Sequence, residues 1–227
     1  MEWTSIGTFR DDAAERAARE AREDRAPDAE GRVEPRSSDA AADRAMDRYA
    51  SGEDAAFSEL YDLLAPRLFA FLLRTTHSRS EAEDLVQQTM LKMHAARGRF
   101  IRGAGVVPWA FSIARRLVID RARRSKVRGV MSHPGDAGDA IAHLASLDLA
   151  VDEIVHAKWL GKLIQRELER LPTKNRLAFE LVKRDGLTHA EAAKVLGITV
   201  MAVKLRTHRT CVALRAALHQ SLDARDP

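Results

Sequence analysis

The sequence contains few of the residues that most often constrain a fold or carry out chemistry. Cys211 is the only cysteine among 227 residues, which excludes a disulfide framework and a cysteine-based metal cluster. Aromatic residues make up only 5% of the chain, and this composition favours short packed helices over sheets. The sequence also lacks a signal-peptide core and an uncharged apolar run of about 18 residues, the length that spans a membrane. We therefore expect a cytoplasmic protein that does not insert into membranes.

The patterns that identify most enzymes are missing as well. We find no nucleophile–base pair, no phosphate-binding loop and no cluster of metal ligands in the sequence. His133, His143 and His156 are spaced too widely along the chain for a compact metal site. We expect neither enzymatic activity nor a cofactor.

Charge is distributed unevenly along the chain, although the formal net charge is only +4. Residues 1–45 carry a net charge of −4, residues 97–128 carry +9, and residues 199–215 carry +4 without any acidic residue. Two separate basic stretches in an otherwise balanced chain indicate a nucleic-acid partner. A solvated helix face is the alternative interpretation of each stretch.

Hydrophobic periodicity predicts an all-α fold with two small helical domains. Residues 1–45 are an acidic, mixed-charge extension with few large apolar groups, which we expect to be mobile or marginally helical. Apolar residues recur at helical spacing over 46–128, where Pro66 either starts a helix or separates two, and again over 152–222. Residues 129–151 contain Gly, Pro, Ser and Asp without a strong pattern, which predicts a flexible linker. We expect the two domains to move independently.

Two amphipathic helices are predicted within the first domain. The stretch SEAEDLVQQTMLKMH begins with Ser80 and Glu83 at the spacing of a capping box. Its apolar stripe consists of Ala82, Leu85, Val86, Thr89, Met90 and Met93. The residues left largely outward are Asp84, Gln87, Gln88 and Lys92. The second helix, WAFSIARRLVIDRARR, follows Pro108 and the glycine-containing loop FIRGAGVVP.

The stretch GLTHAEAAKVLGITVMAVKLRTHR has the features of a helix-turn-helix motif. Thr188 and Glu191 form a capping-box pair, and Gly197 can adopt the left-handed conformation that ends a helix. Thr199 can cap the second helix, whose Val203 points back to the core. The residues that should face outward are Met201, Ala202, Lys204, Leu205, Arg206, His208 and Arg209. In this motif the second helix presents its outer face to the DNA major groove. An ordinary helical hairpin with a basic face is the alternative.

Three motifs in this order resemble the bacterial extracytoplasmic-function (ECF) sigma factors of the sigma-70 family. LPTKNRLAFELVKRDGLTHAEAAKVLGITVMAVKLRTHRTCVALR resembles their C-terminal domain, which reads the −35 element. SEAEDLVQQTML resembles their segment that docks on the coiled coil of the polymerase clamp, and WAFSIARRLVIDRARR resembles their −10-binding helix. The chain departs from the family pattern at Arg116, Leu205, Thr207 and Cys211, where the family usually has Asn, Ser, an apolar residue and a basic residue.

The resemblance implies an alternative sigma factor made of a region 2-like bundle and a region 4-like helix-turn-helix domain. Such a protein binds core RNA polymerase, recognises the −35 and −10 promoter elements and promotes DNA opening. An anti-sigma factor is a further partner that the resemblance implies. A stand-alone helix-turn-helix regulator and a helical protein–protein adaptor are the alternatives, but neither explains all three motifs.

The resemblance also assigns site residues. For polymerase docking these are Asp84, Gln87, Gln88 and Leu91. For the −10 element they are Arg102, Gly103, Gly105, Arg115, Arg116, Arg121, Arg123, Arg124, Lys126 and Arg128. For the −35 element they are Thr199, Met201, Ala202, Lys204, Leu205, Arg206, His208 and Arg209.

Within these sets, individual roles can be assigned. The glycines before the −10 helix allow an unstacked base to approach the backbone closely. Arg206 and Arg209 are expected to read bases or backbone, and Lys204 to contact phosphate. Asp120 is expected to pair with an arginine one helical turn away, at Arg116 or Arg124. Trp109 is expected in the core.

Overall fold

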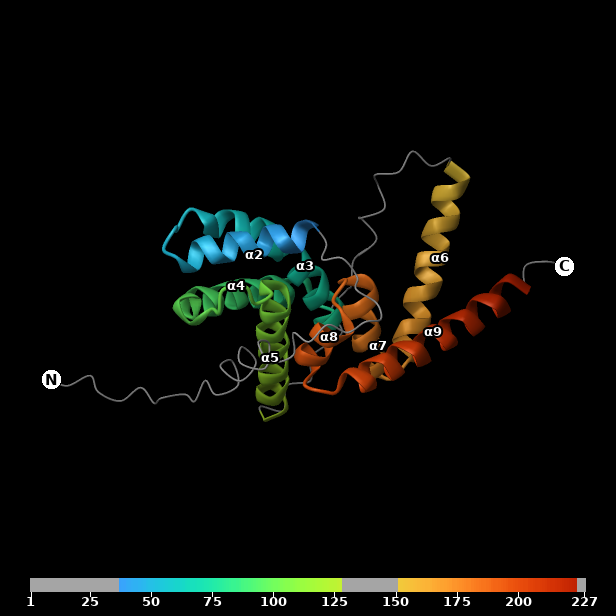
Figure 1. Cartoon of the computed structure of the whole chain (residues 1–227). Coiled ribbons are helices and arrows are strands. Elements are labelled where there is room, and N and C mark those ends of the chain that lie inside the picture. Colours follow the sequence, from blue (N-terminus) through green and yellow to red (C-terminus); the bar gives the residue numbers. More distant parts are fainter. Residues whose placement is uncertain (1–36, 128–150, 224–227) are drawn as a thin grey trace.

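The computed structural model describes residues 37–127 and 151–223, and all regular elements within these ranges are helices (Figure 1). The predicted all-α class is confirmed. Residues 1–36, most of the predicted linker, and Arg128 lie outside the described residues. None of the described helices is both long and apolar enough to cross a membrane.

The first region contains four α-helices and one short 3₁₀ turn. They are α2 (Ser37–Ala50), α3 (Ala56–Thr76), α4 (Arg79–Ala95), η1 (Arg97–Arg99) and α5 (Val106–Val127). The helices α3 and α5 each pack against the other α-helices of this bundle. Leu60, Leu64, Leu68 and Leu72 of α3 are fully buried at four-residue spacing, as expected for a core-facing stripe.

Two predictions about the start of this region are wrong. Residues 37–45 belong to the bundle and not to the extension, because α2 places Ala42, Ala45 and Met46 on one completely buried face. Small alanine side chains let α2 lie close to its neighbours, although they give little hydrophobic signal in the sequence. Pro66 neither starts nor ends a helix, since it lies inside the continuous α3 on the exposed side, between buried Leu64 and Leu68. Burial of the leucine stripe offsets the hydrogen bond that proline removes.

The start of α4 also differs from its prediction. The residue that caps α4 is Ser78, whose hydroxyl accepts a hydrogen bond from the Glu81 backbone N–H at 3.4 Å. Ser80 lies inside the first turn, and the Glu83 carboxylate accepts from Arg79 Nε at 2.9 Å. Because the sequence has a serine three residues before each glutamate, spacing alone could not select the correct pair. The predicted apolar stripe of α4 is confirmed, since all six of its residues are buried.

The second region contains α6 (Val151–Arg170), α7 (Thr173–Phe179), a π-helical turn η3 (Glu180–Arg184), α8 (His189–Leu196) and α9 (Val200–Asp223). The helix α9 packs on α7, α8 and α6. Pro172 immediately precedes α7, where a proline is tolerated because the first helical N–H groups have no intrahelical partner. The distal parts of α6 and α9 project away from the rest of the molecule (Figure 1).

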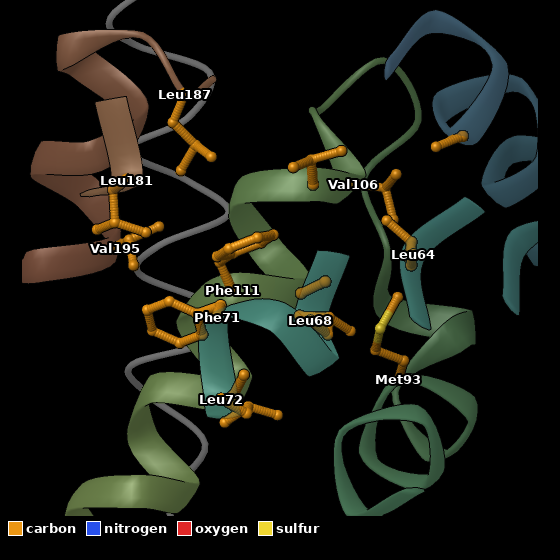
Figure 2. Packing of buried hydrophobic residues seen from close by; sticks show 14 of the residues in the cluster. Leu64, Leu68, Phe71, Leu72, Met93, Val106, Phe111, Leu181, Leu187 and Val195 are labelled. Carbon is orange, nitrogen blue, oxygen red and sulfur yellow. The ribbon is translucent and has the colours of Figure 1, made fainter. Parts of the chain in front are cut away.

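The two regions share one hydrophobic core in this structure, and the independent movement expected for them stays a prediction. Phe71 of α3 and Phe111 of α5 have ring centroids 5.2 Å apart. Figure 2 shows Leu181, Leu187 and Val195 of the second region on one side of this aromatic pair, and Leu64, Leu68 and Met93 of the first region on the other. The helix α8 packs directly against α5.

Candidate polymerase and nucleic-acid interfaces

The helix-turn-helix motif has the local geometry that its sequence predicts. The Thr188 hydroxyl accepts from the Glu191 backbone N–H at 3.2 Å, and the Glu191 carboxylate accepts from the Thr188 N–H at 2.8 Å. Gly197 ends α8 with φ of 65°, in the left-handed region that glycine adopts without strain. The Thr199 hydroxyl then caps α9 by accepting from the Ala202 N–H at 3.2 Å. These local predictions are confirmed.

The helix α9 has a buried face and a free face. The residues on its buried face are Val203, Thr207, Thr210 and Leu214. The residues on its exposed face are Met201, Lys204, Leu205, His208, Arg209 and Val212. Met201 is 72% exposed, Val212 49% and Leu205 46%, so apolar side chains lie along the centre of this face, beside lysine, histidine and arginine. A face of this composition can contact both base methyl groups and phosphates.

Arg206 and Ala202 differ from the other predicted outward residues of α9. Both are half-buried. At roughly 100° of rotation per residue, Arg206 lies about 140° around the helix from Met201 and close to the buried side. Arg206 is therefore on the flank of α9, whereas Lys204, Leu205, His208 and Arg209 share the exposed face.

The outer face of α4 carries the four predicted docking residues together. Asp84, Gln87 and Gln88 are exposed, and Leu91 is 66% exposed although it is a large apolar residue. Beside them, a hollow between α3 and α4 is lined by Tyr61, Asp62, Ala65, Pro66, Phe69, Glu83, Val86 and Gln87. Tyr61 is itself 40% exposed. An apolar patch rimmed by polar groups is typical of a protein-binding surface.

The loop before α5 combines flexible backbone with aromatic side chains. Gly103 has φ of 76°, so this position needs a residue that tolerates the left-handed region. Phe100 and Trp109 flank the loop with ring centroids 5.3 Å apart, and both are half-buried against the core. Trp109 is thus partly in the core, as expected, and partly accessible. Arg102 and Gly103 are exposed and Gly105 is half-buried.

The basic residues predicted on α5 do not share one environment. Arg116, Arg123 and Arg124 are exposed. Arg115 is half-buried, and its burial lowers the pKa of the guanidinium from its ordinary value. Lys126 belongs to the last turn of α5, but its side chain is outside the described part of the chain.

Arg121, one of the residues predicted to contact the −10 element, lies next to a residue predicted to contact polymerase. Its Nε lies 2.8 Å from Glu81 Oε1 and its Nη1 lies 3.9 Å from Asp84 Oδ2, so α5 is joined to α4 by charge. The guanidinium of this arginine is therefore already ion-paired within the protein. The predicted ion pair of Asp120 is wrong, because Arg124 donates to the backbone carbonyl of Asp120 at 3.3 Å and not to its carboxylate.

Sequence reasoning missed two residues of these surfaces. Tyr61 beside the α4 face and Val212 on the α9 face were not predicted, although both are exposed large apolar residues. Val212 lies at i+7 from Leu205 and at i+4 from His208, so the helical spacing that places it on this face was present in the sequence. Tyr61 gave no such signal, since its exposure depends on how α3 packs on α4.

Comparisons with known families cover both regions of the chain. Residues 60–128 match the family model of Sigma-70 region 2, and residues 161–214 match that of Sigma-70 region 4. The first match contains α4 and α5, and the second contains the helix-turn-helix motif. Both regions predicted from the sequence are thus confirmed at the level of family.

Individual relatives agree with these matches. The chain is 33% identical to the ECF RNA polymerase sigma factor SigF of Caulobacter vibrioides over 78% of this chain and 93% of the relative. It is 31% identical to the RNA polymerase sigma factor CarQ of Myxococcus xanthus over 76% of this chain and 95% of the relative. The solved sigma factor RpoE of Bartonella quintana, in complex with the anti-sigma factor NepR, superposes with a TM-score of 0.55 at 27% identity, covering 72% of this chain and 96% of that chain. The chain belongs to the ECF sigma factors of the sigma-70 family, and its function is that of an alternative sigma factor.

Proposed function

We propose that this sigma factor binds core RNA polymerase through the outer face of α4, with Asp84, Gln87, Gln88 and Leu91 as its contacts. The observation that supports this most directly is the exposure of Leu91 beside three polar residues on one helix face. An uncovered leucine in such a setting gains free energy when a partner buries it. The hollow beside Tyr61 extends the same surface across α3.

The docking proposal is tested by a charge reversal with a matched control. Asp84→Arg changes a docking residue, and Glu169→Arg makes the same change at an exposed carboxylate on α6. Each variant is mixed with core polymerase and separated by gel filtration, and circular dichroism checks its helical content. Asp84→Arg is expected to abolish co-elution at concentrations where Glu169→Arg still co-elutes. Equal co-elution of both variants would place the polymerase interface elsewhere.

We propose that α5 and the loop before it hold the −10 strand. Exposed Arg102, Arg116, Arg123 and Arg124 supply phosphate contacts, and the Phe100–Trp109 pair flanks a glycine loop that admits an unstacked base. Extruding a base costs a few kcal/mol, so this surface must bind the open strand more tightly than the duplex. Arg121 is assigned to holding α5 on α4, because Glu81 already neutralises it.

For the −35 element we propose that the exposed face of α9 enters the major groove. Lys204 and Arg209 supply positive charge, while Met201 and Leu205 pack against thymine methyl groups. Arg206 then contacts backbone from the flank of the helix. Of the two contacts predicted for Arg206, to bases or to backbone, its half-buried position beside Val203 favours the backbone.

Two further features complete the proposal. The chain works in the cytoplasm, where core polymerase and promoter DNA are found, and an anti-sigma factor regulates it, as the NepR complex of the Bartonella relative suggests. A stand-alone regulator or an adaptor is not favoured, since neither would need a region 2 match together with a region 4 match. A stand-alone regulator would bind −35 DNA equally well with and without core polymerase, which a gel-shift titration can measure.

A further inference from the structure

The helix that carries the predicted −10 residues begins without a local side-chain cap. The residues directly before α5 are Ala104 and Gly105, and neither has a side-chain oxygen that could accept from the first turn. Val106, the first residue of α5, is fully buried, so its N–H needs a partner within the protein. That partner is Asp43 of α2, whose Oδ1 accepts from the Val106 N–H at 2.7 Å. A residue 63 positions earlier in the chain thus caps α5.

The loop that leads into α5 has two further contacts, and both are local. The Ala104 N–H donates to the Ile101 carbonyl at 3.0 Å and closes a turn around Gly103, whose φ is 76°. A Cβ built on Gly105 would lie 3.2 Å from Cγ of Pro108, so Gly105 lies directly against the proline ring. Neither contact fixes the loop relative to another helix. The hydrogen bond to α2 does so at the point where the loop becomes α5.

The helix α2 holds Asp43 in a fixed place on the bundle. Ala42 and Met46, on either side of Asp43 in the sequence, are fully buried. One turn before Asp43, Asp39 forms an ion pair with Arg67 of α3. An apolar face and an ion pair that does not involve α5 therefore attach α2 to its neighbours. Asp43 is an acceptor of fixed position, against which the start of α5 is aligned.

The carboxyl group of Asp43 lies in an unfavourable electrostatic environment. Burial raises its pKa, and the carboxylates of Asp39, Asp47 and Glu191 raise it further, whereas the hydrogen bond from Val106 lowers it. A raised pKa means that folding disfavours the charged form, which is the form present at neutral pH. The charge of Asp43 therefore does not stabilise the fold as a whole. Its placement is explained by a local task at the start of α5.

This task concerns DNA, because the first turn of α5 also supports the −10 loop. Trp109 belongs to this turn, and its ring centroid lies 5.3 Å from that of Phe100 at the other end of the loop. If the Val106 N–H lost its partner, the first turn would fray and the two rings would no longer be held at a fixed spacing. A loop that has to be ordered during binding lowers the affinity, because ordering it costs conformational entropy.

We propose that Asp43 is a positioning residue for recognition of the −10 element. By accepting the Val106 N–H, it holds the loop of residues 101–105 in the conformation that captures an unstacked base. Asp43 itself does not contact DNA and acts only through Val106. The inference rests on the proposed function of α5 and its loop. It extends the −10 machinery to α2, which lies before the match to Sigma-70 region 2 that begins at residue 60.

The test measures which bases the holoenzyme selects in single-stranded DNA. Core polymerase and the full chain are mixed with a strand that contains a randomised segment, and the bound strands are separated and sequenced. The captured base is the position at which an abasic site weakens wild-type binding most, and wild-type holoenzyme is expected to select strongly there. Asp43→Ala is expected to reduce that selection about fivefold and to leave selection at the other positions within about twofold.

Three variants separate positioning from charge and from general destabilisation. Asp43→Asn keeps an oxygen that can accept from Val106 but removes the charge, so it is expected to restore wild-type selection. Ser78→Ala is the matched control, because it removes the cap of α4, and it should leave the selected bases unchanged. If Asp43→Ala does not fold, Asp43→Ser decides, since its oxygen lies one bond closer to the α2 backbone and falls short of Val106.

Three outcomes would overturn the positioning role. They are wild-type selection in folded Asp43→Ala, an equal loss in Asp43→Asn and Asp43→Ala, and a loss spread evenly over all positions, which would reflect only a smaller active fraction. The proposed function of the loop fails in a different way, since wild-type holoenzyme itself would then select no base in the single strand. The wild-type result alone therefore distinguishes the two failures.

Discussion

The two basic helices, α5 and α9, have different surroundings. The helix α5 is enclosed by α2, α3, α4 and α8, one of its arginines is half-buried, and another is paired with Glu81. The helix α9 packs along one side only and leaves Met201, Leu205 and Val212 uncovered on the other. In this conformation one face of α9 is accessible along its length, whereas α5 is largely covered by neighbouring helices.

This difference shows that positive charge alone does not identify a DNA-binding surface. Residues 97–128 carry the larger net charge, +9, yet part of that charge serves contacts within the protein. Residues 199–215 carry only +4, but their basic side chains share an exposed face with apolar ones. Exposure, more than the number of charges, separates structural arginines from those that can bind DNA.

The largest expected effect is on the free energy of unfolding, when one leucine on each helix is replaced by alanine. Leu117→Ala on α5 should lower the free energy of unfolding by about 3 kcal/mol, because Leu117 is buried and its removal leaves a cavity. Leu205→Ala on α9 should change it by less than about 0.5 kcal/mol, because Leu205 is exposed. Urea unfolding followed by circular dichroism measures both. Similar losses for the two variants would contradict the contrast between the helices.

The next effect concerns base reading by α9. Replacing thymine by uracil in the −35 element removes the C5 methyl groups and should weaken wild-type holoenzyme binding by about 1 kcal/mol per contacted methyl. Leu205→Ala should lose this sensitivity at one position and Met201→Ala at another. Arg206→Ala serves as the control and should retain it. Methyl sensitivity that is unchanged in Leu205→Ala and Met201→Ala would remove these residues from the reading face.

A smaller effect should separate two arginines on α5. Arg116 is exposed, so Arg116→Ala should reduce the salt dependence of single-stranded −10 DNA binding by roughly 0.7 in the log–log slope. Arg121→Ala should reduce the slope much less, because Glu81 already neutralises Arg121. Binding of a labelled −10 strand by holoenzyme at several salt concentrations gives both slopes. Equal reductions would show that Arg121 leaves Glu81 to contact DNA.

Local structure could be predicted from the sequence because its determinants are close together in the chain. The Thr188–Glu191 capping box, the left-handed Gly197 and the Thr199 cap each depend on residues within three positions of one another. The buried stripe of α4 follows in the same way from helical periodicity. These features define the helix-turn-helix motif and the exposed face of α4, so the local structure around the candidate sites could be predicted from the sequence.

Features that depend on tertiary packing could not be predicted. Arg74 of α3 donates a hydrogen bond to Asp185, which lies 111 residues further along the chain, and nothing in either local pattern indicates this contact. The buried part of α2 was missed because alanines at 42 and 45 give a weak hydrophobic signal. The position of Arg206 on the flank of α9 was not predicted, because the motif predicts where the helix lies in the sequence but not which sides of it neighbouring helices cover. Thr207 departs from the family at a buried position, where its hydroxyl has no hydrogen-bond partner.

Transcription reconstituted from purified components tests the central claim most directly. The full chain and core polymerase are combined with templates in which the −35 and the −10 elements are scrambled separately. Transcript should appear only when the chain and core are both present, and each scrambled element should reduce it at least tenfold. Asp84→Arg should abolish it on the intact template while Glu169→Arg preserves it. Initiation that is indifferent to either element, or equal activity of the two variants, would contradict the assignment of these surfaces.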